Sequence, residues 1–132
     1  MNTFSQSKLN EVASQSLYTT FTNSNTILYS VTIFSRFLQK GNVLELGPAE
    51  GLMTGYLLEY DPQLTVIEGS SVFAAQLKEK YPTVRVIQSL FEETEMEERF
   101  DFIVLGHVLE HVANPVLLLT QIKKWLAPGG KL

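Results

Sequence analysis

The sequence predicts a doubly wound α/β domain, built on a mostly parallel sheet and preceded by a helical cap. Short apolar runs recur at residues 42–46, 64–68, 83–88 and 100–105, and each has the length of a buried strand. Segments with helical periodicity separate most of these runs, and Gly and Pro mark the turns between them. Strands that alternate with helices in this way form parallel sheets with helices on both faces.

The composition fits one domain and disfavours several classes of function. Of the 132 residues, 45% are hydrophobic and 18% are charged, which is enough apolar material for a packed core. The net charge is -4 and no basic stripe is visible, so a nucleic-acid partner is disfavoured. Cysteine is absent, which removes disulfides and thiolate chemistry and is compatible with a reducing cytoplasm. Neither a membrane span nor a secretory signal is evident, so we expect a cytoplasmic protein.

Residues 1–40 are rich in Ser, Thr, Asn and Gln and predict two helices that cap the sheet. Apolar residues at helical spacing from Leu9 to Leu17 indicate the first helix, and those from Ile27 to Leu38 indicate the second. Polar residues at 22–25 are suited to helix N-caps and predict the break between the helices. Three aromatic residues of this cap either pack against the sheet or line a ligand pocket: Tyr18, Phe21 and Tyr29.

From residue 41 the chain alternates strands and helices, which places the core domain at residues 41–132 and the cap at residues 1–40. Pro128-Gly129-Gly130 is expected to stop the last helix, so that Lys131-Leu132 begins a fifth strand. The expected elements are strand 42–46, helix 52–60, strand 64–68, helix 70–80, strand 83–88, a short helix or loop at 91–99, strand 100–105 and helix 115–126.

The strand at 100–105 is among the most apolar runs in the sequence and is expected near the sheet centre. With only the start of a fifth strand after it, this strand would form an exposed apolar edge, which promotes aggregation. We therefore expect that the chain is a fragment with its C-terminal strands missing, or that a partner, such as the second copy in a homodimer, supplies them.

The turn at residues 47–51 is the first candidate site. The carboxyl end of a buried parallel strand that meets a glycine turn is where open α/β sheets bind nucleotide-like ligands. This turn lacks the middle Gly of G-x-G-x-x-G and the Lys of a phosphate-binding loop, and it carries Glu50. A phosphate therefore fits poorly, whereas a cationic or zwitterionic ligand suits the preceding Glu45. Glu68 ends the second strand, where a carboxylate can accept two hydrogen bonds from a ribose diol.

Five motifs follow one another along the core. They are Val43–Gly51, Val66–Glu68, Phe100–Val104, His107–Val112 and Leu126–Gly130. In order and spacing they resemble those of the Rossmann-like class I S-adenosylmethionine-dependent methyltransferases, within the broad group that has an L-E-H-V signature after the fourth strand. The resemblance covers residues 42–132, about two-thirds of the chain. It implies S-adenosyl-L-methionine as the methyl donor and S-adenosyl-L-homocysteine as the product, and it leaves the acceptor open.

The resemblance also implies roles for individual residues. Glu45 matches the acid that reaches the amino group of the methionine moiety, and Glu68 matches the acid that holds the ribose hydroxyls. Many relatives have an Asp near Leu90 that bonds the adenine amino group; that acid is absent here, so adenine contact would depend on backbone groups and apolar packing. The implied cofactor-binding residues are Glu45, Gly47, Ala49, Gly51, Glu68, Gly69, Ser70, Ser89, Leu90, Phe91, Gly106 and His107.

His107 is the candidate catalytic residue, because the resemblance places the methyl group and the acceptor after the fourth strand. An imidazole can take a proton from a hydroxyl acceptor near neutral pH; alternatively, His107 only shapes the pocket or bonds a backbone carbonyl. The spacing His107-x-x-Glu110-His111, which would place His107 and His111 on one face of a helix, also suggests a metal site as an alternative. The ubiquinone-pathway O-methyltransferases carry E-x-x-E-H here, for which a divalent ion is implied. We expect instead that Glu110 and His111 fix the strand-to-helix connection, and predict no metal site.

These observations predict an S-adenosylmethionine-dependent methyltransferase that acts on a small molecule, such as a sugar or another biosynthetic intermediate, at an oxygen or nitrogen atom. The acidic balance favours this acceptor over RNA or protein. The alternatives are a catalytically incomplete binding or interaction module and, least favoured, a metal-dependent hydrolase. The acidic run from Glu92 to Glu98 is expected to be a solvated face, with a basic partner as its alternative.

Overall fold

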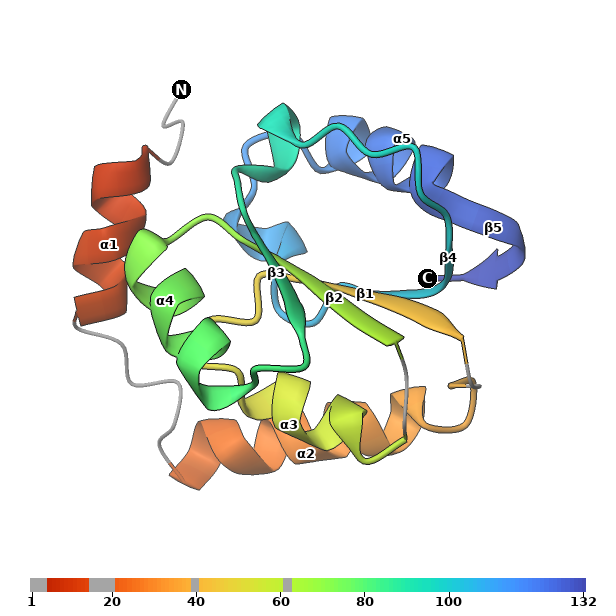
Figure 1. Cartoon of the computed structure of the whole chain (residues 1–132), viewed down its shortest axis with the longest axis horizontal. Helices are drawn as coiled ribbons and strands as arrows, with labels where there is room; N and C mark the ends of the chain where they lie inside the picture. The colour runs from red at the N-terminus through yellow and green to blue at the C-terminus, as the bar shows by residue number, and fades with distance from the viewer. Residues whose placement is uncertain (1–4, 15–20, 39–40, 61–62) are drawn as a thin grey trace.

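The computed structural model describes residues 5–14, 21–38, 41–60 and 63–132. Strands and helices alternate along the core, and the cap is helical, as the sequence predicts (Figure 1). The elements are α1 (Gln6–Ser14), α2 (Phe21–Phe34), β1 (Asn42–Leu46), α3 (Leu52–Leu58), β2 (Gln63–Glu68), α4 (Ser71–Lys80), β3 (Arg85–Gln88), the 3₁₀ turn η1 (Phe91–Glu93), β4 (Phe100–Val104), the 3₁₀ turn η2 (Leu109–His111), α5 (Pro115–Trp125) and β5 (Leu126–Lys131).

Within the described residues the strands form one sheet in the order β3-β2-β1-β4-β5, and every neighbouring pair is parallel. The chain builds outward from β1 through β2 to β3, and then returns to the other side of β1 with β4 and β5. The strand order therefore reverses between β1 and β4. The crevice at the carboxyl ends of strands beside such a switch point is the general ligand site of open α/β sheets.

The fifth strand differs from the prediction. It begins at Leu126, directly after α5, and contains the Pro128-Gly129-Gly130 segment that was expected only to stop the last helix. It pairs with β4 from Phe100↔Leu126 to Phe102↔Lys131 with a shift in register between them. The expectation that β4 forms an exposed edge is therefore wrong, because β5 occupies that edge. A Pro is tolerated there, since an edge strand can leave one side of its backbone unpaired.

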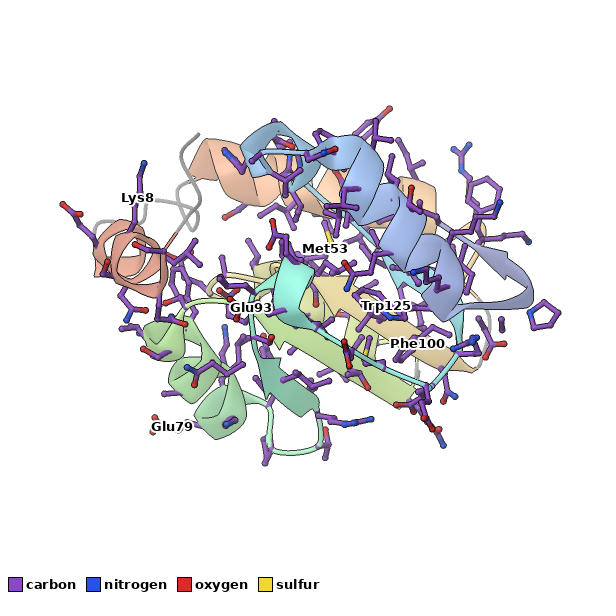
Figure 2. The ribbon with its side chains drawn as sticks, turned by 90° about the horizontal axis from the view of Figure 1, so that it is seen from above. Lys8, Met53, Glu79, Glu93, Phe100 and Trp125 are labelled. Atoms are coloured by element: carbon purple, nitrogen blue, oxygen red, sulfur yellow. The ribbon has the colours of Figure 1, made fainter. Side chains whose placement is uncertain are left out.

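Two apolar cores lie on opposite faces of the sheet. On one face, Val31 of α2 and Leu57 of α3 pack in a cluster with Val43 and Val66 of the strands. On the other face, α5 covers the sheet, and its Trp125 lies over Phe100 of β4 (Figure 2). Both rings are almost completely buried. Helices on both faces of a parallel sheet confirm the doubly wound α/β class.

The two N-terminal helices confirm the helical cap but correct its details. Helix α2 begins at Phe21 rather than near Ile27, so the break predicted at residues 22–25 is wrong. Those polar residues lie in the first turns of α2, where backbone N–H groups lack helical partners. Tyr29 is 68% exposed and neither lines a pocket nor packs on the sheet. Leu17, Tyr18 and the side chain of Phe21 lie outside the described residues.

Among the residues that the structure describes, no helix has the length and apolar character needed to cross a membrane.

Candidate functional site

A cavity of about 590 Å³ opens at the carboxyl ends of the strands. Its walls come from the loops after β1, β2, β3 and β4, and Leu9 of α1 and Ile27 of α2 close part of it. Of the residues predicted to bind a cofactor, those that line this cavity are Glu45, Gly47, Ala49, Glu68, Gly69, Ser70, Ser89, Leu90, Phe91, Gly106 and His107. The sequence-predicted site residues therefore gather around one space, with Gly51 as the exception.

Glu68, the last residue of β2, is held by backbone N–H groups on two sides. The N–H of Ser70 donates to its Oε1 at 2.7 Å, and the N–H of Ala49 donates to its Oε2 at 3.1 Å. Burial raises the pKa of this carboxyl, and the backbone hydrogen bonds oppose that rise. A carboxylate has about four lone-pair sites, so each oxygen can still accept a further hydrogen bond from a ligand.

Glu45, on the neighbouring strand β1, is only 2% exposed. Burial, with a smaller contribution from the charge of Glu68, raises its pKa to about 8, although Thr54 Oγ1 donates a hydrogen bond to Oε2 at 2.7 Å. The side chain of Glu45 therefore holds a proton at neutral pH when the cavity is empty. A positively charged group in the cavity would favour the ionised form, since opposite charges attract strongly where water is excluded.

In the turn after β1, three of the four backbone N–H groups donate to oxygens of the protein. The N–H of Gly47 donates to Ile67 O at 2.9 Å, and that of Gly51 donates to Pro48 O at 2.9 Å. Ala49 gives its N–H to Glu68, and Pro48 has none. A phosphate cradle needs several free N–H groups that point at one anion. The turn is therefore poorly suited to phosphate, as its sequence predicts.

Gly51 supports the turn from outside the cavity. Its φ of 80° lies in the left-handed region, and a Cβ built there would come within 2.5 Å of Leu77 Cδ2. The hydroxyl of Tyr81, at the end of α4, donates to Gly51 O at 2.9 Å. Gly51, which was predicted to bind the cofactor, does not line the cavity, and this glycine is required where the turn packs against α4.

Helix α1 is fastened over the loop that follows Glu68 (Figure 1). The hydroxyl of Ser70 donates to Asn10 Oδ1 at 2.9 Å, and Asn10 Nδ2 donates to Ser71 Oγ at 2.9 Å. Leu9 packs so closely on Gly69 that a Cβ at that glycine would lie 2.7 Å from Leu9 Cδ1. The cap thereby contributes to the wall of the cavity beside Glu68.

His107 lies at the mouth of the cavity in a left-handed backbone conformation, with φ 57°. Its Nδ1 is 3.8 Å from Glu110 Oε1. Residues 109–111 form only a 3₁₀ turn, so the expectation that His107 and His111 share one face of a helix is wrong. No group of three or more His, Cys, Asp or Glu side chains able to hold a metal ion occurs in the described part of the chain.

Several lining residues were not predicted from the sequence. Met53 and Thr26 come from helices α3 and α2, whose inward-facing positions become known only once the helices are packed. Glu50 was noted only as an obstacle to phosphate, yet it lines the cavity and its Oε2 is buried with no hydrogen-bond partner in the described residues. The sequence signal that could have identified Glu50 as a lining residue is its charge within the tight turn at residues 47–51.

Comparisons with known proteins agree on one kind of domain. The sequence profile of the family described as "Methyltransferase domain" matches residues 27–132. Ribosomal RNA small subunit methyltransferase A of Chlorobium phaeobacteroides (strain BS1) is 27% identical over 100 residues, which cover 74% of this chain and 38% of that protein. Ubiquinone biosynthesis O-methyltransferase of Rickettsia akari (strain Hartford) is 28% identical over 101 residues, covering 74% and 40%. The chain thus spans less than half the length of these curated relatives.

Solved structures give the same architecture. DhpI, in a complex with SAM and HEP, superposes with a TM-score of 0.78 at 22% identity, over 94% of this chain and 60% of that one. The N-methyltransferase NodS from Bradyrhizobium japonicum WM9, in complex with S-adenosyl-L-homocysteine, has a TM-score of 0.76 at 20% identity, over 92% and 69%. At these identities the likeness shows the fold.

Proposed function

The chain belongs to the methyltransferase-domain family, and from this premise we propose that its cavity binds S-adenosyl-L-methionine and that the protein transfers the methyl group to a small-molecule acceptor. The observation that carries the proposal is the pair of buried acids, Glu45 and Glu68, at the ends of adjacent strands and in the wall of one cavity. A cytoplasmic location is part of the proposal and is supported by the absence of cysteine.

The two acids suit the two polar ends of this cofactor. Glu68 is fixed by the N–H groups of Ala49 and Ser70, so its remaining lone pairs have set directions for the two hydroxyls of a ribose. Glu45 is buried and protonated when the cavity is empty, and the positive amino group of the methionine moiety would favour its ionisation.

The chain's own residues also fit the rest of the cofactor. Because three of the four N–H groups in the 47–51 turn already donate to protein oxygens, the turn suits a ligand without phosphate. The apolar side chains of Leu90 and Phe91, after β3, line the cavity where an adenine ring would need flat, apolar contacts. Leu9 of α1 covers the loop at Gly69 and shields that end from water.

When bound, S-adenosyl-L-methionine supplies a methyl group already activated on a positive sulfur. The protein therefore has to align an acceptor with that group and exclude water. His107 and Gly106 follow β4 at the switch point of the sheet, and both line the cavity. If the acceptor is a hydroxyl, the imidazole of His107 can take its proton, and Glu110, at 3.8 Å, can stabilise the resulting positive charge.

Isothermal titration of the chain with S-adenosyl-L-homocysteine tests the cofactor proposal. We expect one site per chain, and at least about tenfold weaker binding for Glu68→Ala, which removes a charged hydrogen-bond acceptor. Glu79→Ala is the matched control, because Glu79 is exposed on the outer side of α4 (Figure 2). A folded chain that binds no S-adenosyl-L-homocysteine would contradict the proposal, and binding without methyl transfer to any acceptor would indicate a binding module instead.

A further inference from the structure

Helix α1 lies outside the part of the chain that matches the methyltransferase family, which begins at residue 27. The helix nevertheless contributes to the cavity, because Leu9 is part of the cavity wall. Figure 1 shows α1 beside α4, which is its main packing partner among the helices and strands. The wall of the cavity therefore includes a residue that the family match does not cover.

The loop to which α1 is attached is also the loop that holds Glu68. Asn10 Oδ1 accepts a hydrogen bond from Ser70 Oγ at 2.9 Å, and Asn10 Nδ2 donates one to Ser71 Oγ at 2.9 Å. The backbone N–H of the same Ser70 donates to Glu68 Oε1 at 2.7 Å, and its Oγ accepts from the N–H of Phe73 at 3.3 Å. Ser70 therefore links α1, the carboxylate of Glu68 and the first turn of α4.

Leu9 covers the end of the cavity at which the proposed adenosyl group lies. A Cβ built on Gly69 would lie 2.7 Å from Leu9 Cδ1 and 3.3 Å from Leu90 Cδ2, so the two leucines flank the same glycine. Both leucines line the cavity. In the proposed function Glu68 holds the ribose and Leu90 contacts the adenine. A nucleoside bound there would gain apolar contact with Leu9 only while α1 is docked.

The docking of α1 depends on a small buried surface. Among the side chains of α1 that the structure describes, none is fully buried, and Leu9 and Asn10 are half-buried. A segment that buries little apolar surface can open while the rest of the domain stays folded. A ligand that contacts such a segment only in its docked state stabilises docking, and by linkage docking strengthens ligand binding by the same factor.

We propose that Asn10 is a positioning residue of the cofactor site: it docks α1 onto Ser70, and this docking and the binding of the adenosyl group favour each other. The inference rests on the proposed function, since the ligand is the same cofactor. Asn10 acts through Ser70, whose N–H fixes one carboxylate oxygen of Glu68. It also acts through Leu9, which the docked helix holds over Gly69.

Amide hydrogen exchange of the wild-type chain tests this coupling without any variant. We expect saturating S-adenosyl-L-homocysteine to slow exchange in residues 6–14 at least about fivefold, the low end of typical coupling between sites. The nucleoside 5′-methylthioadenosine, which has the adenosyl group but no amino-acid end, should protect α1 in the same way. A purely structural contact would not make exchange in α1 depend on the ligand. Unchanged exchange in α1 with either ligand bound would overturn the inference.

Asn10→Ala provides the reciprocal test, by isothermal titration with S-adenosyl-L-homocysteine. We expect its affinity to fall at least about fivefold, whereas its urea unfolding midpoint stays close to that of the wild type, because α1 opens locally. Glu79→Ala, at an exposed position on the outer side of α4, should keep the wild-type affinity (Figure 2). Wild-type affinity of Asn10→Ala would overturn this inference alone, whereas a folded wild-type chain that binds no S-adenosyl-L-homocysteine would contradict the proposed function itself.

Discussion

The N–H of Ala49 donates a hydrogen bond to Glu68 Oε2 at 3.1 Å, and this bond ties the turn after β1 to the end of β2. Ala49 adopts a left-handed conformation, with φ 50°, that aims its N–H at the carboxylate. This one hydrogen bond thus fixes both the loop under the proposed methionine moiety and the carboxylate of Glu68 under the proposed ribose.

Replacing Glu68 by Gln should destabilise the fold. A Gln side chain offers one acceptor oxygen to two backbone donors, so the N–H of Ala49 or of Ser70 loses its partner. We expect the free energy of unfolding to fall by about 1–3 kcal/mol. Urea unfolding can be followed by the fluorescence of Trp125, the only tryptophan, which is 2% exposed. Glu79→Gln should stay within about 0.5 kcal/mol of the wild type; equal stability of the two variants would refute the role of Glu68.

The raised pKa of Glu45 should be visible in the pH dependence of the free energy of unfolding. The pKa of Glu45 is about 8 in the folded chain, whereas an unperturbed Glu, as in the unfolded chain, has a pKa of 4.5. Between pH 4.5 and pH 8 the unfolded chain therefore binds fewer protons than the folded chain. The free energy of unfolding therefore falls as pH rises through this window, by up to about 1.4 kcal/mol per pH unit, and levels off above pH 8.

Glu45→Gln provides the comparison for that pH profile. Gln can still accept the hydrogen bond from Thr54 but does not titrate. As pH rises from about 5 to about 8, the wild type should lose more unfolding free energy than Glu45→Gln, so the variant becomes more stable relative to the wild type. Parallel profiles, measured by urea unfolding in ligand-free buffer, would show that Glu45 does not carry the raised pKa.

Gly51→Ala and Gly129→Ala form a matched pair. Both glycines have a left-handed φ, 80° and 76°, so both substitutions cost about 1 kcal/mol of backbone strain. A Cβ at Gly129 meets nothing within 4 Å, whereas one at Gly51 meets Leu77 at 2.5 Å and Tyr81 at 2.9 Å. The free energy of unfolding of Gly51→Ala should therefore fall by about 1–3 kcal/mol more than that of Gly129→Ala, because the added methyl group overpacks the contact with α4. Thermal unfolding that ranks the two variants equally would contradict the packing account.

Asn10→Ala should release α1 from the core. The variant loses one accepted and one donated hydrogen bond to the start of α4. We expect faster amide hydrogen exchange in residues 6–14 with little change in β1 and β2, because local opening draws on few contacts. Gln76→Ala, at an exposed position of α4, is the control. Unchanged exchange in α1 would mean that Leu9, and not Asn10, holds the helix.

The sequence identifies Glu45 and Glu68 because their positions depend on local signals. Each ends or interrupts a short apolar strand, and adjacent parallel strands bring such ends to one edge of a sheet. The contact of Asn10 with Ser70 joins residues 60 positions apart and leaves no local pattern. The start of β5 was predicted five residues too late, at Lys131 instead of Leu126, for a different reason: its Pro-Gly-Gly segment has low strand propensity, and pairing with the edge of β4 makes it a strand.

A crystal structure of the chain grown with S-adenosyl-L-homocysteine tests the central claim most directly. The account predicts the ribose hydroxyls within hydrogen-bond distance of both oxygens of Glu68, and the amino group of the homocysteine moiety beside Glu45. A ligand bound elsewhere, or one in the cavity whose ribose does not contact Glu68, would contradict it.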